Sequence, residues 1–228
     1  PVWTSTGGQV PAALNHVFYQ MHEGGMESTV SVAEDNTWVR ISASLVLLQA
    51  GESHSFTATS GAAVMASGPV IVTGTCGGSS VCAWASARLA GRRFVSFVEH
   101  GDPQTVSVLA RDARTSVDVY ETDGYRRQKL ATLEADTASP VSYQHSWSRK
   151  VLEVEATSDI LVAIATANGT DNFVVAPASS VLYGWTSGSS HVAAFGGQTV
   201  SITEQCSDGA TTARSTALWQ SSSVVDYP

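Results

Sequence analysis

Residues 18–32 read FYQMHEGGMESTVSV, and residues 94–108 read FVSFVEHGDPQTVSV. Aligned without a gap at an offset of 76 residues, the two stretches share these positions: Phe18/Phe94, Glu23/Glu99, Gly25/Gly101 and Thr29–Val32/Thr105–Val108. Each copy has two short apolar runs separated by a polar break that contains glycine, which is the sequence signature of a β-hairpin. The duplication predicts a tandem array of β-units built on this hairpin.

The residues after each hairpin follow one order of elements. A polar turn precedes a strand at 37–41 (TWVRI) in the first copy and at 115–119 (TSVDV) in the second. Within 63–78 and 154–169, both copies then show a short strand, a small polar turn and a strongly apolar strand. Continuous rather than alternating apolarity predicts that this last strand is buried on both faces or lies in the centre of a sandwich.

One segment carries a competing signal. The spacing of Leu14, Val17, Phe18 and Met21 fits a helix. The matching region of the second copy, FVSFVE at 94–99, is rich in β-forming residues. The repeat therefore favours a strand in both copies.

A third unit begins near residue 173, with strands expected at 191–195 and 199–203. We predict an all-β fold of tandem antiparallel β-sandwich-like units, with about two and a half repeats. The predicted boundaries are 1–86 for the first unit, 87–172 for the second, and 173–228 for a partial third unit or a C-terminal segment that completes a sheet.

The composition favours β-structure and disfavours two kinds of partner. Charged residues make up only 14% of the 228 residues, whereas helix surfaces usually carry many Glu and Lys. The formal net charge of −8 disfavours nucleic acid, which requires a basic surface. No apolar run approaches the ~20 residues of a membrane span, so we expect no span. Two small basic groups are predicted to be solvated loop or strand-edge charges: Arg88, Arg92 and Arg93, and Arg126, Arg127 and Lys129.

Cysteines and a sequon bear on the location of the protein. Cys76 and Cys82 flank the segment GGSSV and are candidates for a disulfide, which leaves Cys206 either free or paired between chains. Asn168 begins the sequon Asn-Gly-Thr and is a candidate for glycosylation. The chain starts abruptly at Pro1, without a signal-peptide pattern, so we expect a mature or excised fragment. The sequon and the pair Cys76 and Cys82 together favour a secreted or cell-surface protein.

No constellation of catalytic residues emerges. The six histidines show neither HxH nor HExxH spacing, and no G-x-S-x-G motif is present. Glu153 and Glu155 alternate with Leu152 and Val154, which predicts the polar outer face of an amphipathic strand rather than a carboxylate pair. We therefore predict no catalytic residue, no metal site and no cofactor.

The six tryptophans are spread along the chain, and most are expected to fill cores because each buries a large area. Trp38 is the exception, because Thr37, Val39 and Ile41 alternate with it and belong to the other face of the strand. Trp38 is therefore the candidate for an exposed, ligand-binding contact.

Three stretches of the first copy resemble a known family: EDNTWVRI (34–41), LLQAGESHSF (47–56) and VMASGPVIVTG (64–74). They resemble the repeating β-rich unit of the IgGFc-binding-protein N-terminal family and related hyalin-like surface modules. Those units run as a D-x-T-x-V-x-I strand, a leucine–glycine turn and an S-D-K-P-I-A-V strand, and here Ser67–Val72 and Ser158–Ala163 stand at the last position. The resemblance covers about 150 residues and implies extracellular adhesive or structural β-modules, without a catalytic residue.

The leading hypothesis is a non-enzymatic extracellular structural or adhesive β-repeat protein that assembles into a fibre or surface layer, with itself or other extracellular proteins as partners. A glycan-binding module that uses exposed tryptophans is the alternative. A polysaccharide-acting enzyme is the weaker alternative, because no site supports it.

Overall fold

The computed structural model describes residues 15–22, 24–75, 83–98, 103–122, 126–146, 150–166, 172–175, 177, 190–194, 199–205, 211–217 and 223–227. Across these ranges the regular structure is β-strand, apart from one 3-10 turn at Ala87–Leu89. This confirms the all-β prediction. Residues 15–20 form a strand, so the repeat was the correct guide where local spacing also fitted a helix.

The first seven strands form one antiparallel sheet, which we call the first unit: β1 (Asn15–Gln20), β2 (Met26–Val32), β3 (Thr37–Ile41), β4 (Ser44–Leu48), β5 (Ser53–Ala58), β6 (Ala63–Thr75) and β7 (Trp84–Ser86). The next seven form the second unit: β8 (Gly91–Val98), β9 (Pro103–Ala110), β10 (Thr115–Thr122), β11 (Arg127–Ala135), β12 (Val141–Ser146), β13 (Lys150–Thr166) and β14 (Asn172–Val175).

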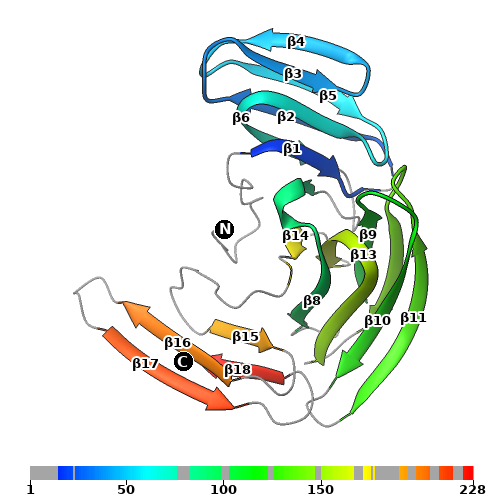
Figure 1. Ribbon diagram of the computed structural model, residues 1–228, viewed down its shortest axis with the longest axis vertical. Coiled ribbons are helices and arrows are strands. Elements are labelled where there is room, and N and C mark those ends of the chain that lie inside the picture. The colour runs from blue at the N-terminus through cyan, green and yellow to red at the C-terminus, as the bar shows by residue number, and fades with distance from the viewer. Residues whose placement is uncertain are drawn as a thin grey trace.

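The two units share one pairing scheme. In each, the long sixth strand pairs with the first, second and third strands, the second strand also pairs with the fifth, and the third also pairs with the fourth. The seventh strand differs, because β7 pairs with β1 whereas β14 pairs with β13. The tandem repetition predicted from the sequence is therefore present in the strand topology, and Figure 1 shows the two units following one another along an arc.

The long strand of each unit bends where the sequence predicts a turn. The expected turn is wrong, because β6 and β13 run unbroken through it. Between two successive pairs at the bend, the first strand advances by two residues while the long strand advances by five. In the first unit Asn15 pairs with Val70 and Val17 pairs with Met65. The second unit has the same register, because Gly91 pairs with Ile160 and Arg93 pairs with Glu155. Such a bulge bends a strand without ending it. A Cβ added at Gly68, inside the bend of β6, would lie 2.7 Å from Oγ1 of Thr37, so the bend of β6 favours glycine at this position.

The bend lets one strand serve two layers. Residues 63–66 of β6 pair with β1 and β3, and residues 70–75 pair with β2. Buried side chains from both layers meet in one core, as in a sandwich. The core of the first unit contains Phe18, Val30, Val39, Val64 and Val72, and that of the second contains Phe94, Val106, Val117, Val154 and Val162, among others.

A third apolar cluster joins the two units. Leu161, Ala163 and Ala165 on β13 pack with Met21 and with residues of the β7 region, including Ala85. The alternate residues of β13 face the core of the second unit, so β13 is buried on both faces, as the sequence predicts. In β6 the corresponding run is buried on one face only, because Ile71 is half-buried between two buried valines.

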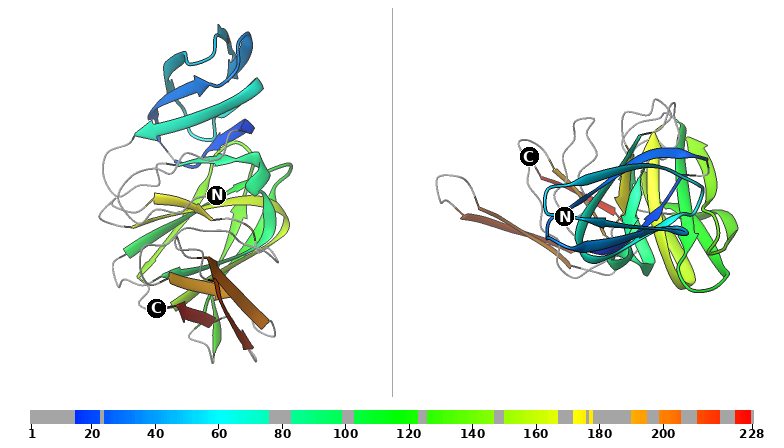
Figure 2. Two further views of the ribbon diagram at one scale, coloured as in Figure 1. Left: turned by 90° about the vertical axis from the view of Figure 1, so that its left-hand side faces the viewer. Right: turned by 90° about the horizontal axis from the view of Figure 1, so that it is seen from above.

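The C-terminal part repeats the inner pairing of the units. It contains β15 (Ser190–Ala194), β16 (Thr199–Gln205), β17 (Thr211–Ala217) and β18 (Ser223–Tyr227). Strand β15 pairs with β18, and β16 pairs with β17, which reproduces the nesting of the second to fifth strands in each unit. The sequence predicts strands at about the positions of β15 and β16. Figure 2 shows the β16–β17 ladder extending away from the two seven-stranded sheets.

Gly61 lies where a loop of the first unit meets a loop of the second. Its φ is +69°, and an added Cβ would overlap the carbonyl group of Ala138. Gly61→Ala is expected to lower the free energy of unfolding by about 3 kcal/mol, because the left-handed conformation and the overlap each add about 1–2 kcal/mol. Gly51→Ala is the matched control, since Gly51 has φ +81° but no heavy atom within 4 Å of the added Cβ. Urea unfolding measures both variants, and equal losses would contradict the contact between the loops.

Candidate interaction surface

Trp38 lies on the outward side of β3. Along this strand Thr37, Val39 and Ile41 are buried, whereas Trp38 is 48% exposed and Arg40 is also exposed. The alternation in the sequence therefore placed Trp38 on the correct face. Trp84 agrees with the expectation for most tryptophans, because it is buried and its Nε1 donates to Oγ of Ser28 at 3.0 Å.

Three further apolar side chains are exposed on the same face. Trp38 is opposite Leu47 on β4, and Arg40 is opposite Leu45 on β4 and Met65 on β6. Their exposed fractions are 61% for Leu45, 41% for Leu47 and 44% for Met65. We call these five residues the β3–β4 apolar face: Trp38, Arg40, Leu45, Leu47 and Met65. They are the large exposed apolar residues of the described chain together with one cation.

This face reaches a free sheet edge. Strand β4 stands at the end of the order β4-β3-β6-β1-β7, and it pairs with no second strand among the described residues. In Figure 1, β4 lies at the end of the molecule that is farthest from the second unit. A sheet edge exposes unpaired backbone N–H and C=O groups to which another strand can add.

The second unit shows what the same fold carries elsewhere at these positions. Val39 is opposite Ala66 of β6 and Val117 is opposite Ala156 of β13, which aligns β3 with β10. The register then gives the residues equivalent to Trp38, Arg40, Leu45, Leu47 and Met65: Ser116, Asp118, Thr132, Glu134 and Glu155. Four apolar side chains in the first unit are thus replaced by two hydroxyls and two carboxylates in the second.

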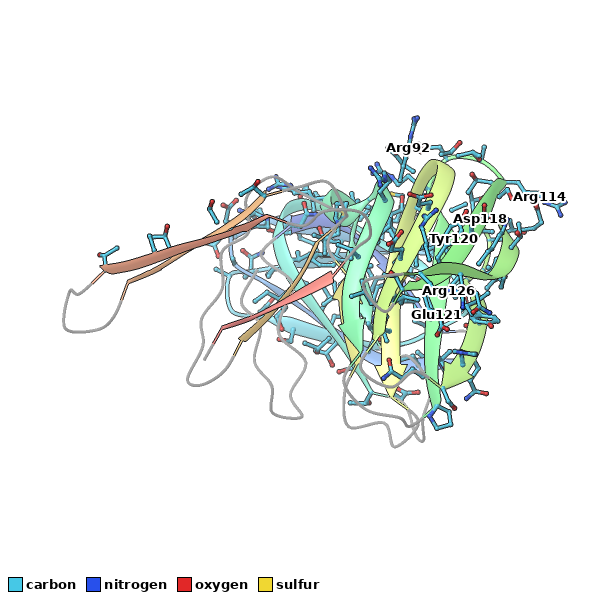
Figure 3. The ribbon with its side chains drawn as sticks, turned by 90° about the horizontal axis from the view of Figure 1, so that it is seen from below. Arg92, Arg114, Asp118, Tyr120, Glu121 and Arg126 are labelled. Atoms are coloured by element: carbon cyan, nitrogen blue, oxygen red, sulfur yellow. The ribbon has the colours of Figure 1, made fainter. Side chains whose placement is uncertain are left out.

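The carboxylates of the second unit are paired. The ion pairs are Asp118–Lys129 at 2.7 Å, Glu134–Arg114 at 3.4 Å, and Glu155 with Arg127 at 2.9 Å and Arg93 at 3.2 Å. The hydrogen bond from Lys129 lowers the pKa of Asp118 below its ordinary value, assisted by bonds from Thr132 and Tyr120. Figure 3 shows Arg114, Asp118 and Tyr120 on the side of the second unit that is remote from β16 and β17.

One charge of this network is buried. The side chain of Glu153 is only 3% exposed, and its Oε2 accepts from Nε of Arg127 at 2.7 Å. The guanidinium of Arg127 also lies 3.5 Å from the ring centroid of Tyr120. The sequence predicts Glu153 as part of a polar outer face and Arg127 as a solvated charge. The alternation with Leu152 is correct, but Glu153 is buried and ion-paired, because Arg127 of β11 reaches across Tyr120 of β10 and pairs with it.

Arg40 has no such partner. Its Nε donates to the carbonyl oxygen of Ser42 at 3.2 Å, and no ion pair joins it to any residue in the described ranges. The first unit therefore presents an apolar face with one cation in the middle, beside an open edge. Such an arrangement suits the burial of another apolar polypeptide surface.

Within the described part of the chain, no group of three or more His, Cys, Asp or Glu side chains is placed to hold a metal ion. Where the structure describes the chain, no helix is long and apolar enough to cross a membrane. Cys76, Cys82, Cys206 and Asn168 lie outside the described residues, so the candidate disulfide, the candidate intermolecular thiol and the candidate glycosylation site stay predictions.

Comparison with known proteins finds no match: no family model, no curated protein and no solved structure matches the chain.

Proposed function

We propose that this chain is a non-enzymatic, extracellular structural or adhesive β-repeat protein that associates with itself. The observation that carries the proposal is the β3–β4 apolar face beside the free edge of β4. Burying four large apolar side chains is favourable at about 25 cal/mol per Å² of apolar area. The polar residues at the same positions in the second unit support the proposal, because they demonstrate that the fold does not itself require apolar residues there.

The extracellular location in this proposal rests on the sequence. The sequon at Asn168 and the closely spaced Cys76 and Cys82 are features of secreted proteins. The resemblance to IgGFc-binding-protein N-terminal and hyalin-like modules implies the same class of function. Tandem units also suit an extended assembly, since each unit adds a sheet without requiring a new fold.

Self-association is tested by sedimentation velocity over about 1 µM to 1 mM, a range that covers weak to moderate complexes. The mean mass is expected to rise with concentration, with or without reductant, because the apolar face contains no cysteine. A chain that remains monomeric throughout the range would refute the proposal. Association that disappears with reductant would show that the contact is a disulfide, such as one through Cys206, and not this apolar face.

Binding of glycans is the second candidate, favoured by the 48% exposure of Trp38. A sugar ring that stacks on tryptophan also needs polar groups for its hydroxyls. The neighbours of Trp38 on this face are mainly Leu47, Leu45 and Met65, so glycan binding ranks behind protein association. A glycan array with the native chain, Trp38→Ala and the control Met65→Ala tests it. Binding lost only in Trp38→Ala would support this function, and an array without any binding would eliminate it.

A further inference from the structure

We infer that β4 of one copy of the chain pairs antiparallel with β4 of a second copy, so that two first units form one continuous sheet. This inference rests on the proposed self-association. It adds the location of the contact between the two copies, which we call the β4 joint, and the relative direction of the two paired strands.

The first support is a contrast between two equivalent edges. Strand β11 occupies in the second unit the place that β4 occupies in the first, and both end their sheets. Strand β11 carries the charged residues Arg127, Lys129 and Glu134, and charges on an edge strand oppose pairing with another chain. Strand β4 reads SLVLL and carries no charge. The same fold therefore protects one edge and leaves the other open.

The second support is that β4 is complementary to itself. An antiparallel pair centred on Val46 places Leu45 of each copy opposite Leu47 of the other. Directly opposed side chains have Cβ atoms about 4.5–5.5 Å apart and stabilise a sheet when both are apolar. The joint would thus create a ribbon of four leucines on the outward side, while Val46 remains directed towards the core side of the sheet.

The third support is the distribution of charge along β4. Arg40 lies beside the turn that enters β4, where its Nε donates to the carbonyl oxygen of Ser42. Carboxylates lie at the opposite end of β4, where Asp35 accepts from the amide of Ala50 and Glu52 accepts from the amide of Gln49. Antiparallel pairing puts the positive end of one copy beside the negative end of the other. Parallel pairing would put like charges together, which is unfavourable within about 10 Å at ordinary salt.

The geometry also sets the size and strength of the assembly. An antiparallel joint between identical strands has two-fold symmetry and closes as a dimer. A five-residue edge buries a small area, so the dissociation constant is expected between about 10 µM and 1 mM. A fibre would require a second, different interface.

The test transfers the residues of the second unit onto the edge of the first. Leu45→Thr/Leu47→Glu introduces the residues that stand at the equivalent positions, Thr132 and Glu134. Ser55→Glu is the matched control, because it adds the same charge to an exposed position of β5, which lies outside the β3–β4 apolar face. Circular dichroism and urea unfolding establish that each variant remains folded.

Sedimentation velocity and hydrogen exchange then measure the joint. The edge double variant is expected to dimerise at least about tenfold more weakly than the native chain, a difference of roughly 1.4 kcal/mol, whereas Ser55→Glu stays within about threefold. In the native chain, amides of residues 44–48 are expected to exchange more slowly at high than at low concentration. If a variant fails to fold, the exchange of the amides of residues 44–48 in the native chain still tests the joint.

The outcomes separate the two proposals. If the native chain associates but the double variant associates equally, or if exchange at 44–48 is independent of concentration, the β4 joint is refuted while self-association survives. If Ser55→Glu weakens association as much as the double variant and the β4 amides stay unprotected, the added charge and not the edge explains the loss, which also refutes the joint. If the native chain is monomeric throughout, the proposed function itself is refuted.

Discussion

Replacing Arg127 with methionine is expected to lower the free energy of unfolding by about 3–5 kcal/mol, because the substitution leaves a charge buried without its partner. That charge is the carboxylate of Glu153, whose side chain is 3% exposed and accepts from Arg127 at 2.7 Å. Arg127 also holds Glu155 at 2.9 Å and packs over the ring of Tyr120. Urea unfolding of the native chain and the variant at neutral pH measures the loss.

Two further variants make this result specific. Arg114→Met breaks the ion pair between Arg114 and Glu134, whose side chains are 72% and 53% exposed, respectively. Because this pair is exposed, its loss should lower the free energy of unfolding by no more than about 1 kcal/mol. The double variant Arg127→Met/Glu153→Leu should recover most of the loss, since a buried ion pair can be replaced by apolar residues at little cost. Similar small losses for Arg127→Met and Arg114→Met would indicate that Glu153 is hydrated, contrary to its burial.

Leu161→Ala is expected to cost about 2–5 kcal/mol and to split thermal unfolding into two transitions. Leu161 is fully buried, and it packs with Met21 and Ala85 in the cluster that joins the two units. A cavity at this position weakens the joint while leaving both cores intact. The first unit should then unfold separately from the second, and differential scanning calorimetry would detect this as a second peak.

Ile164→Ala is the control for the joint. Ile164 is also fully buried on β13, but it faces the core of the second unit. It should produce a loss of similar size, about 2–5 kcal/mol, through the second unit's own core. If both variants change the calorimetric profile in the same way, the cluster around Leu161 does not couple the units.

The alternation and the repeat made much of the fold predictable. The shared blocks at 18–32 and 94–108 identified the first two strands of both units, and the alternation around Trp38 identified its outward face. These signals are local, since side chains of a strand alternate between its faces whatever the partner strands are. The bend of β6 and β13 resembled a turn, because small polar residues suit both a bulge and a chain reversal.

The candidate site was only partly predictable. The run Leu45–Leu48 is continuously apolar, a pattern typical of a buried strand, yet Leu45 and Leu47 are exposed because they share the outward face of the sheet with Trp38. The position of a strand within a sheet depends on all the pairings around it: β4 pairs with the adjacent β3, and the other side of β3 is occupied by the more distant β6. Nothing in the run itself distinguishes an edge strand from a central one.

Which charged residues form ion pairs is equally hard to predict from the sequence. Arg127 and Glu153 are 26 residues apart, and their pairing arises because β10 lies between β11 and β13 in the sheet. The sequence by itself determined the repeated strands and which side chains share a face, because these follow from local periodicity. Only the tertiary structure decided which of those faces is covered, which carboxylate is buried and which edge is open, because each depends on neighbours brought together by long-range strand pairing.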